Sequence, residues 1–196
     1  IMTLPAAMAK ALLPQIQATN AQQEYYLTDL IALAREAEYA VVARHDPDWT
    51  SYVGVNTLQG LAWAEKIANR RCALSLMQQG VHIIDPERFD CRGEVIAAAD
   101  VVIDVGVILK GRVELAPGVR IGAYSVLEDV VLSKDVIIEP HSVMTGVCLH
   151  AQVRVGPFAY LRPGTQLLQQ SKVGAFVEVK NTTLGPGSKA NHLSYL

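Results

Sequence analysis

The sequence has little net charge, few cysteines and no long hydrophobic run. Its 17 basic and 19 acidic residues leave a net charge of −2, which argues against a general nucleic-acid binder and a polybasic membrane-surface protein. The three cysteines, Cys72, Cys91 and Cys148, form no CxxC motif. This spacing argues against a disulfide framework or structural zinc site and favours a reducing, cytoplasmic setting. With no run of roughly 18 apolar residues and no basic region leading into an apolar one at the start, the sequence predicts neither a membrane span nor a signal peptide.

Aliphatic residues dominate what the chain does contain. Hydrophobic residues make up 51% of the 196 positions and aromatic residues only 6%, a composition that favours aliphatic stacking. The charges are unevenly distributed, because residues 1–100 carry 8 Lys/Arg and 12 Asp/Glu, whereas residues 149–196 carry 5 and 1. The C-terminal quarter, in which Glu178 is the single acidic residue, is therefore locally basic and suited to an anionic ligand.

The first 80 residues show mainly helical periodicity. Apolar spacing predicts helices over residues 4–16, ended or kinked by Pro14, and over residues 26–38. Residues 39–43 are a candidate for a short buried strand. Thr57 is suited to cap a long helix that reaches about Gln79, where Gly80 would end it. A long exposed helix between two different kinds of sequence predicts a linker between domains.

From about residue 100 the sequence repeats with a period of six. Of the 15 intervals between successive aliphatic positions, 12 are six residues and 3 are five, and a small or β-branched residue follows each position by four. Neither an amphipathic helix nor simple strand alternation predicts this period. The aliphatic positions are Ile103, Leu109, Leu115, Ile121, Leu127, Leu132, Ile138, Met144, Leu149, Val155, Leu161, Leu167, Val173, Val179, Leu184 and Ala190.

This repeat predicts stacked coils of short parallel strands, in which each hexad buries its aliphatic residue only against its neighbours. A Val-rich β-sandwich with accidental spacing is the alternative, and the number of matches disfavours it. The period is that of the hexapeptide-repeat left-handed parallel β-helix. Handedness does not follow from spacing, because parallel crossovers are normally right-handed, and rests on the family resemblance. In that family three hexads form one coil.

Two cations in the last quarter are separated by one coil. Arg162 follows Leu161 and Lys180 follows Val179, so both side chains are expected to point outward from the same corner, on strands roughly 5 Å apart. Two cations at this distance repel each other unless an anion lies between them. The planar fork of arginine and the mobile charge of lysine suit a phosphate, although a solvated face with coincidental stacking is the alternative.

His192 and Tyr195 lie two and five residues beyond Ala190, the last aliphatic position of the repeat, and are expected on the next side of that coil. A histidine takes up a proton near neutral pH, so His192, near the expected phosphate clamp, is a candidate general base toward an amine or hydroxyl. A lone histidine is more often structural, and that alternative stays open.

Several strings resemble the bifunctional bacterial enzymes that make UDP-N-acetylglucosamine, in which glucosamine-1-phosphate N-acetyltransferase is joined to N-acetylglucosamine-1-phosphate uridylyltransferase. The most specific are GPFAYLRPGTQL and VGAFVEVKNTTLGPGSKANHLSYL, and NAQQEYYLTDLI and GVN extend the resemblance to the N-terminal part. It implies that Arg162, Lys180 and Tyr195 hold the sugar phosphate and that His192 is the base. Asn56, in the GVN string, would help to hold Mg2+ and the nucleotide sugar, with a turn residue before the long helix as the alternative.

The resemblance implies a mixed fold in three parts. Residues 1–56 would be the C-terminal part of an α/β nucleotidyltransferase (uridylyltransferase) domain, residues 57–80 a linker helix, and residues 81–196 a left-handed β-helix acetyltransferase domain. Acetyl-CoA and UTP are the expected co-substrates, a homotrimer the expected assembly, and no nucleic acid or membrane partner is expected. The sequence is interpreted as a piece of a longer protein, and these residues alone are expected to catalyse neither step.

Two other functions share parts of this pattern. Another hexapeptide-repeat acyltransferase, acting on serine or a nucleotide-linked sugar, would explain the coils and the histidine but not the N-terminal part. A non-catalytic trimeric β-helix scaffold would explain the coils alone.

Overall fold

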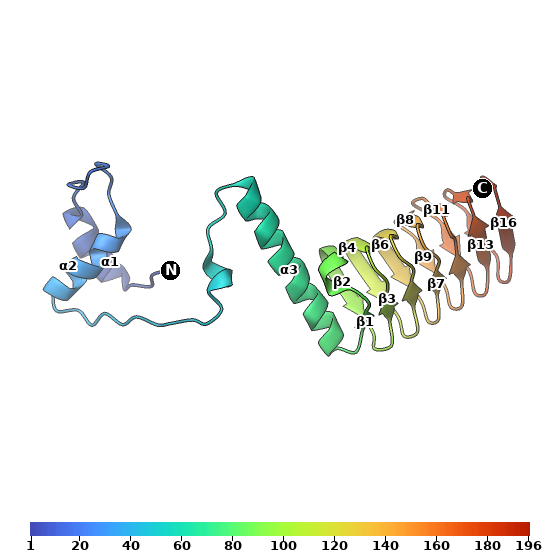
Figure 1. The fold of residues 1–196 in the computed structure, drawn as a ribbon, viewed down its shortest axis with the longest axis horizontal. Helices are drawn as coiled ribbons and strands as arrows, with labels where there is room; N and C mark the ends of the chain where they lie inside the picture. The colour runs from blue at the N-terminus through green and yellow to red at the C-terminus, as the bar shows by residue number, and fades with distance from the viewer. The chain divides into compact units, whose positions relative to one another are not determined.

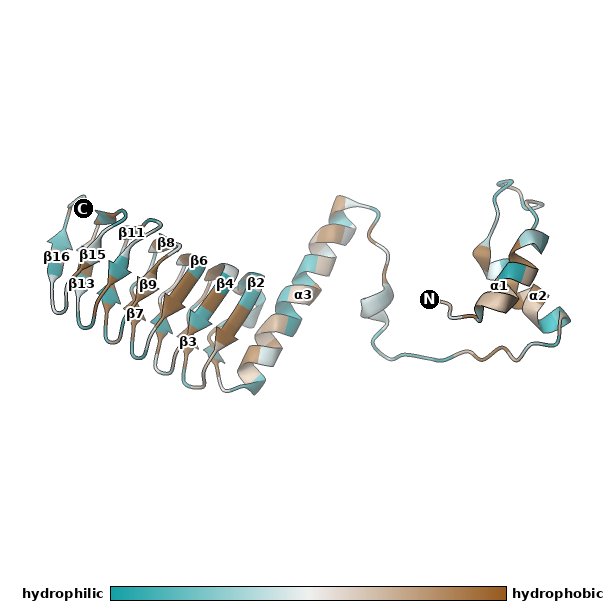
Figure 2. Cartoon of the chain, turned by 180° about the vertical axis from the view of Figure 1, so that it is seen from behind, coloured by the Kyte–Doolittle hydropathy of each residue, from teal (hydrophilic) through white to brown (hydrophobic).

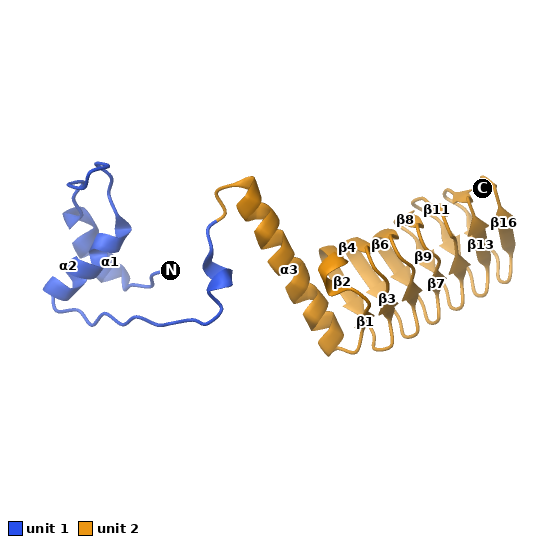
Figure 3. Ribbon diagram, viewed as in Figure 1, with its two compact units in different colours: residues 1–54 blue, residues 55–196 orange.

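The computed structural model describes all residues from 1 to 196 and divides into two compact units, Ile1–Gly54 and Val55–Leu196 (Figure 3). The first unit contains only helices and irregular segments. The second contains one long helix and a stack of strands (Figure 1). No helix in either unit combines the length and the apolar character needed to cross a membrane.

The first unit is held by a small apolar cluster between two short helices. Helices α1 (Ala6–Leu12) and α2 (Leu30–Glu36) pack through Leu12, Leu30 and Ala34, each at most 4% exposed. Both predicted helices exist but are shorter than the periodicity suggested. After α1 the chain continues as a 3-10 turn, Leu13–Gln15, because Pro14 lacks the amide hydrogen that an α-helix needs. The other 3-10 turns of this unit are Leu27–Asp29 and Trp49–Tyr52.

The strand predicted over residues 39–43 is wrong, because these residues have no regular structure. Helix α2 instead ends with Glu38 in a left-handed conformation and with the Tyr39 amide donating to the Ala34 carbonyl at 2.9 Å. A strand needs a neighbour to receive its backbone hydrogen bonds, and residues 1–54 supply no other strand. The α/β architecture expected for the N-terminal part is therefore not present in these residues.

Helix α3 (Leu58–Gln78) begins where the sequence predicts. The Thr57 hydroxyl accepts a hydrogen bond from the Gly60 amide at 3.0 Å, and the chain leaves the helix through Gly80 with φ +95°. Hydrophobic and hydrophilic residues are mixed around the helix (Figure 2), and only Ala73 and Leu76, near its C-terminal end, are buried. This end joins the core of the first coil, whereas Leu58 at the other end is 84% exposed.

The rest of the second unit is a parallel β-solenoid, which confirms the left-handed β-helix predicted from the sequence. Every strand pair is parallel, and partners are 17 to 20 residues apart, about one coil of three hexads. A 3-10 turn, Pro86–Arg88, precedes the second strand. The strands are β1 (His82–Ile83), β2 (Asp90–Ala97), β3 (Val102–Ile103), β4 (Ile108–Leu115), β5 (Arg120–Ile121), β6 (Val126–Leu132), β7 (Ile137–Ile138), β8 (Val143–Thr145), β9 (Cys148–Leu149), β10 (Arg154–Val155), β11 (Tyr160–Leu161), β12 (Gln166–Leu167), β13 (Lys172–Ala175), β14 (Glu178–Val179), β15 (Thr183–Leu184) and β16 (Lys189–His192).

Each coil has three faces. In the first coils, one long strand runs over two of these faces. One face has the order β1-β3-β5-β7-β10-β13-β16. In the first coils, β2 and β4 each run over both remaining faces, and β6 then pairs with β8 through its first half and with β9 through its second. From there the two faces continue separately as β8-β11-β14 and β9-β12-β15. The candidate site lies on the face of β8, β11 and β14.

The aliphatic positions of the hexads form the predicted internal column. All of them are at most 3% exposed except Leu184, at 7%, and Ala190, in the last coil. The small residue four positions later is not always the inward one, because two of the five-residue intervals shift the inward position by one residue. Val130 and Val147 are buried there, whereas Val131 is 43% exposed. The inward small residue lies two positions before the next aliphatic residue, because side chains two apart point to the same side of a strand.

One outer corner carries a ladder of stacked rings that the hexad analysis missed. Tyr124, His141, Phe158 and Phe176 stack in sequence, with ring centroids 5.4, 4.9 and 5.1 Å apart and nearly parallel planes. Each has a positive φ, so the side chain projects outward from a tight turn between two faces. Leu193 continues this column at φ +48°. The ladder borders the face that carries the candidate site.

Candidate functional site

Arg162 and Lys180 lie at the same corner on neighbouring coils. The strand pairing aligns Leu161 with Val179, and each cation follows its inward residue. The Arg162 amide donates to the Val179 carbonyl at 2.9 Å, and the Lys180 amide donates to the Leu196 carbonyl at 2.8 Å. Backbone hydrogen bonding therefore holds both positions in register, as the 18-residue spacing predicts.

The turn after Arg162 packs directly on the turn after Lys180. Gly164 has φ +82°, and a Cβ atom there would lie 2.6 Å from the Asn181 Oδ1 atom of the next coil. The Gly164 amide also donates to the Gly146 carbonyl of the previous coil at 3.2 Å. Only glycine combines this conformation with the close approach, so the Arg-Pro-Gly-Thr string keeps the corner compact.

Glu178 is a member of this corner that the sequence reasoning did not assign. Its Oε1 atom lies 3.0 Å from Arg162 Nη1, and each side chain is 36% exposed. The ion pair orients one edge of the guanidinium, whereas Lys180 makes no ion pair. The spacing in the sequence could have indicated their proximity. Glu178 lies 18 residues after Tyr160 and pairs with it on the next coil, and Arg162 is two residues after Tyr160.

Tyr195 and His192 lie on the last coil, at the same face. Tyr195 forms a parallel bridge with Glu178, which places it one coil beyond the Arg162–Glu178 pair, and its side chain is 65% exposed. His192 ends β16, opposite Ala175 of β13, and is exposed. The Ser194 hydroxyl donates to the His192 carbonyl at 2.9 Å. No protein group is hydrogen bonded to the imidazole, which leaves both ring nitrogens available to a ligand.

The four candidate residues thus border one face of the last three coils. His192 lies just before the corner of the aromatic ladder, Tyr195 lies on the face, and Arg162 and Lys180 lie at the opposite corner. A hollow at this end of the solenoid includes His192. Its lining is completed by Leu184, Ser188, Lys189, Ala190, Asn191, Ser194 and Leu196. This arrangement offers two cations for an anion and an imidazole for a proton.

Asn56 does not belong to this group. It is exposed and precedes the Thr57 cap of α3, which packs on the first coil. No group of three or more histidine, cysteine or carboxylate side chains lies together anywhere in the chain, so no such cluster accompanies the Asn56 amide. A Mg2+ site needs several oxygen ligands, and the residues present do not complete one.

No protein-family profile matches the chain, but individual proteins do. The Bifunctional protein GlmU of Alkalilimnicola ehrlichii is 49% identical over 196 residues, which cover all of this chain and 42% of that protein. The protein of the same name from Methylibium petroleiphilum is 45% identical over 196 residues, with 43% of its length covered. The resemblance identified in the sequence is therefore confirmed over the whole chain, which spans about two fifths of the length of these relatives.

Among solved structures, the chain is similar to an H141N mutant of perosamine N-acetyltransferase from Caulobacter crescentus in complex with CoA and GDP-perosamine. The identity is 17% and the TM-score 0.29, over 65% of this chain and 60% of that one.

Proposed function

Because the chain matches a segment of GlmU from end to end, we propose that it is the central part of a bifunctional enzyme of UDP-N-acetylglucosamine synthesis. Residues 81–196 would belong to an acetyltransferase domain that transfers the acetyl group of acetyl-CoA to glucosamine-1-phosphate. Residues 1–56 would belong to a uridylyltransferase domain that then transfers UMP from UTP, and residues 57–80 would link the two. These substrates are intracellular metabolites, so the proposed setting is the cytoplasm.

The observation that carries the acetyltransferase proposal is the corner of Arg162 and Lys180. Two outward cations on adjacent coils, held by backbone hydrogen bonds, form a site for one phosphate group. Glu178 holds one edge of the guanidinium and leaves the other donors free for the ligand. The Tyr195 hydroxyl, one coil beyond Glu178, is a further donor for the same ligand.

In this mechanism His192 prepares the amine for attack. The neutral imidazole removes a proton from the amino group of glucosamine-1-phosphate as the nitrogen attacks the carbonyl carbon of the acetyl thioester. The C–N bond forms, the C–S bond of the tetrahedral intermediate breaks, and the CoA thiolate takes up a proton as it leaves. The exposed imidazole, free of protein partners, suits a group that must accept and return a proton.

The uridylyl-transfer part of the proposal rests on the resemblance alone. Asn56 would contribute one amide oxygen toward Mg2+ and the nucleotide sugar, but the chain holds no cluster of three or more other ligand side chains. No step is therefore assigned to a metal in these residues. Assembly as a homotrimer belongs to the same proposal and rests on the same resemblance.

His192→Ala in the complete protein tests the assignment. The variant is expected to lose CoA release from acetyl-CoA and glucosamine-1-phosphate by at least about 100-fold, since general-base catalysis contributes about 10²- to 10⁴-fold. Pyrophosphate release from UTP and N-acetylglucosamine-1-phosphate should stay unchanged. Parallel loss of both activities would indicate misfolding, and unchanged CoA release would refute the role of His192.

Substrate protection separates this proposal from the other two functions. Glucosamine-1-phosphate should raise the thermal midpoint of the complete protein, because a ligand that binds only the folded state stabilises it. Protection by serine instead would favour a different acyltransferase of the same fold. Protection by none of these ligands, with no CoA release, would favour a scaffold.

A further inference from the structure

Two lysines lie side by side on the face of β10, β13 and β16, away from the corner of Arg162 and Lys180. Lys172 begins β13 and Lys189 begins β16, and the strand pairing aligns the two residues. The Lys172 amide donates to the Ser188 carbonyl at 2.8 Å, which holds this register. Because neighbouring strands lie about 5 Å apart, the two exposed side chains leave the face almost at the same place.

No carboxylate neutralises these two lysines. Residues 149–196 contain one acidic residue, Glu178, and its carboxylate is already paired with Arg162 at 3.0 Å. In the preceding coils of the same face, Glu139 is paired with Arg154 at 3.2 Å. Neither lysine takes part in an ion pair, so two positive charges stand next to each other without a counter-charge from the protein.

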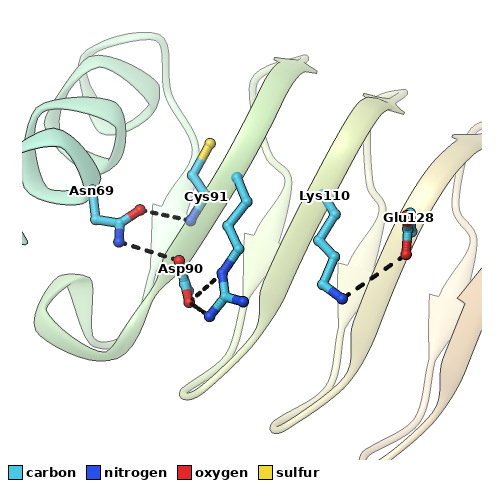
Figure 4. Close-up of polar contacts among 6 residues, drawn as sticks. Asn69, Asp90, Cys91, Lys110 and Glu128 are labelled. Carbon is cyan, nitrogen blue, oxygen red and sulfur yellow. Dashed lines mark hydrogen bonds and ion pairs between the residues drawn. The ribbon is translucent and has the colours of Figure 1, made fainter. Parts of the chain in front are cut away.

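Other outward cations of the solenoid have different neighbours. Lys110 is aligned with Glu128 of the next coil, and their Nζ and Oε2 atoms lie 3.9 Å apart (Figure 4). Arg120 makes no ion pair, but the residues aligned with it on the two adjacent coils are Val102 and Ile137. A carboxylate or an apolar neighbour therefore avoids repulsion at these positions, and the two lysines of β13 and β16 have neither.

The surroundings of Lys189 leave room for a ligand. In the turn before it, no heavy atom apart from the chain neighbours lies within 4 Å of the position that a Cβ atom of Gly187 would take. Lys189 also lines the hollow at the end of the solenoid, together with Ser188, Asn191 and His192. The serine hydroxyl and the asparagine amide are further hydrogen-bond donors for an anion in this hollow.

We propose that Lys172 and Lys189 form a second phosphate site, which takes linked phosphates such as inorganic pyrophosphate or the diphosphate group of a nucleotide. Lysine binds phosphate as a mobile point charge, so each ammonium group can take one of two linked phosphates. An anion between the two side chains also removes their mutual repulsion. The site lies on a different face from Arg162 and Lys180 and does not depend on the role proposed for them.

Protection of lysines from acetylation by acetic anhydride, followed by peptide mass mapping of the full chain, tests the site. Pyrophosphate should protect Lys172 and Lys189 and should not protect Lys134. Lys134 is the internal control, because it is exposed in a turn and the turn of the next coil carries Ala151 and Gln152 in place of a cation. Equal protection of Lys134, or protection of none of the three, would overturn the proposal.

Two nucleotides distinguish the sources of the linked phosphates. UTP and CoA both carry such a group, and each replaces pyrophosphate in the same labelling experiment. Protection by CoA would assign the site to the acetyl donor, and protection by UTP would assign it to the nucleotide. Protection by pyrophosphate alone would assign it to the free anion. Each of these results supports the site, and protection by none of the three ligands would refute it.

Calorimetric titration of variants with pyrophosphate gives the size of the effect. Titrations are made in an Arg162→Ala background, so that the corner of Arg162 and Lys180 contributes little. Lys172→Ala and Lys189→Ala should each weaken binding about 10- to 100-fold, the factor expected for one hydrogen bond between charged groups. Lys134→Ala should leave the affinity unchanged. Unchanged affinity in both other lysine variants, with an unchanged urea midpoint, would contradict the proposal whatever the role of Arg162.

Discussion

Residues 1–54 and the solenoid bury their apolar side chains in different ways. In the first unit three residues, Leu12, Leu30 and Ala34, form the buried cluster, whereas thirty buried residues form the core of α3 and the coils. Each coil is covered by the next, so the core grows with every repeat. The short helices of the first unit have no such repeated neighbour. Burial in the solenoid is therefore a property of the repeat, and burial in residues 1–54 depends on a few contacts.

Leu127→Ala should destabilise the solenoid more than any other substitution considered for either unit. Leu127 is fully buried and stacks between Leu109 and Met144 of the neighbouring coils. Removing its branched end leaves a cavity in the column, and we expect a loss of about 2–5 kcal/mol in the free energy of unfolding. Urea denaturation followed by far-ultraviolet circular dichroism measures it.

Two controls locate this effect in the column. Val131→Ala, at a 43% exposed position of the same strand, should change stability by no more than about 0.5 kcal/mol. Leu30→Ala should leave the unfolding transition of the strands unchanged, because Leu30 belongs to the separate cluster. A transition that shifts equally in all three variants would mean that the two units unfold together.

Arg162→Ala should weaken substrate binding, whereas a substitution on another face of the solenoid should not. In the complete protein it should raise the KM for glucosamine-1-phosphate about 10- to 100-fold, since a hydrogen bond to a charged group contributes about 1.5–3 kcal/mol. Arg154→Ala is the matched control, because Arg154 forms a comparable ion pair with Glu139, at 3.2 Å, on another face. Steady-state kinetics on both variants check the contrast.

Stability should not separate these two arginines. Both ion pairs are partly exposed, so each substitution should cost at most about 1 kcal/mol. An equal rise in KM in both variants would remove the basis for placing the phosphate at the Arg162 corner.

Ser171→Ala should produce a small change in the free energy of unfolding, and the change should be stabilising. The Ser171 hydroxyl is buried without a hydrogen-bond partner, whereas the buried Thr165 hydroxyl donates to the Val179 carbonyl at 3.2 Å. Removing the unpaired hydroxyl should raise the free energy of unfolding by about 1 kcal/mol. Thr165→Val should lower it by a similar amount, and urea denaturation of both variants is the measurement. A loss of stability in Ser171→Ala would show that the hydroxyl has a partner.

The success of the sequence analysis differed between these regions for a physical reason. The hexad period predicted the solenoid and the shared corner of Arg162 and Lys180, because in a repeat the spacing along the chain is also the spacing in space. It did not reveal the pairing of Glu178 with Arg162. That contact depends on which way a long side chain turns between two coils. The strand predicted over residues 39–43 failed because pairing needs a partner that local composition does not supply.

The register of the small residues shows the same limit on a finer scale. Val131 follows the aliphatic Leu127 by four residues, but the structure buries Val130 and leaves Val131 43% exposed. The interval between Leu127 and Leu132 is one residue short, and the pairing of β6 with β4 shifts register within it, so inward positions must be counted back from the next aliphatic residue. Alternation along the strand, and not distance from the previous coil, decides which side chain is buried.

By itself the sequence determined the coil, its aliphatic column, the Thr57 cap and the basic character of the last coils, since these follow from periodicity and from residue type. Tertiary structure alone decided the ion pair of Glu178 with Arg162 and the parallel stacking of the rings from Tyr124 to Phe176. The reason is that each of these contacts joins side chains from different turns of the chain. The spacing of about one coil brings these residues near each other, but the direction in which each side chain turns depends on packing between the coils.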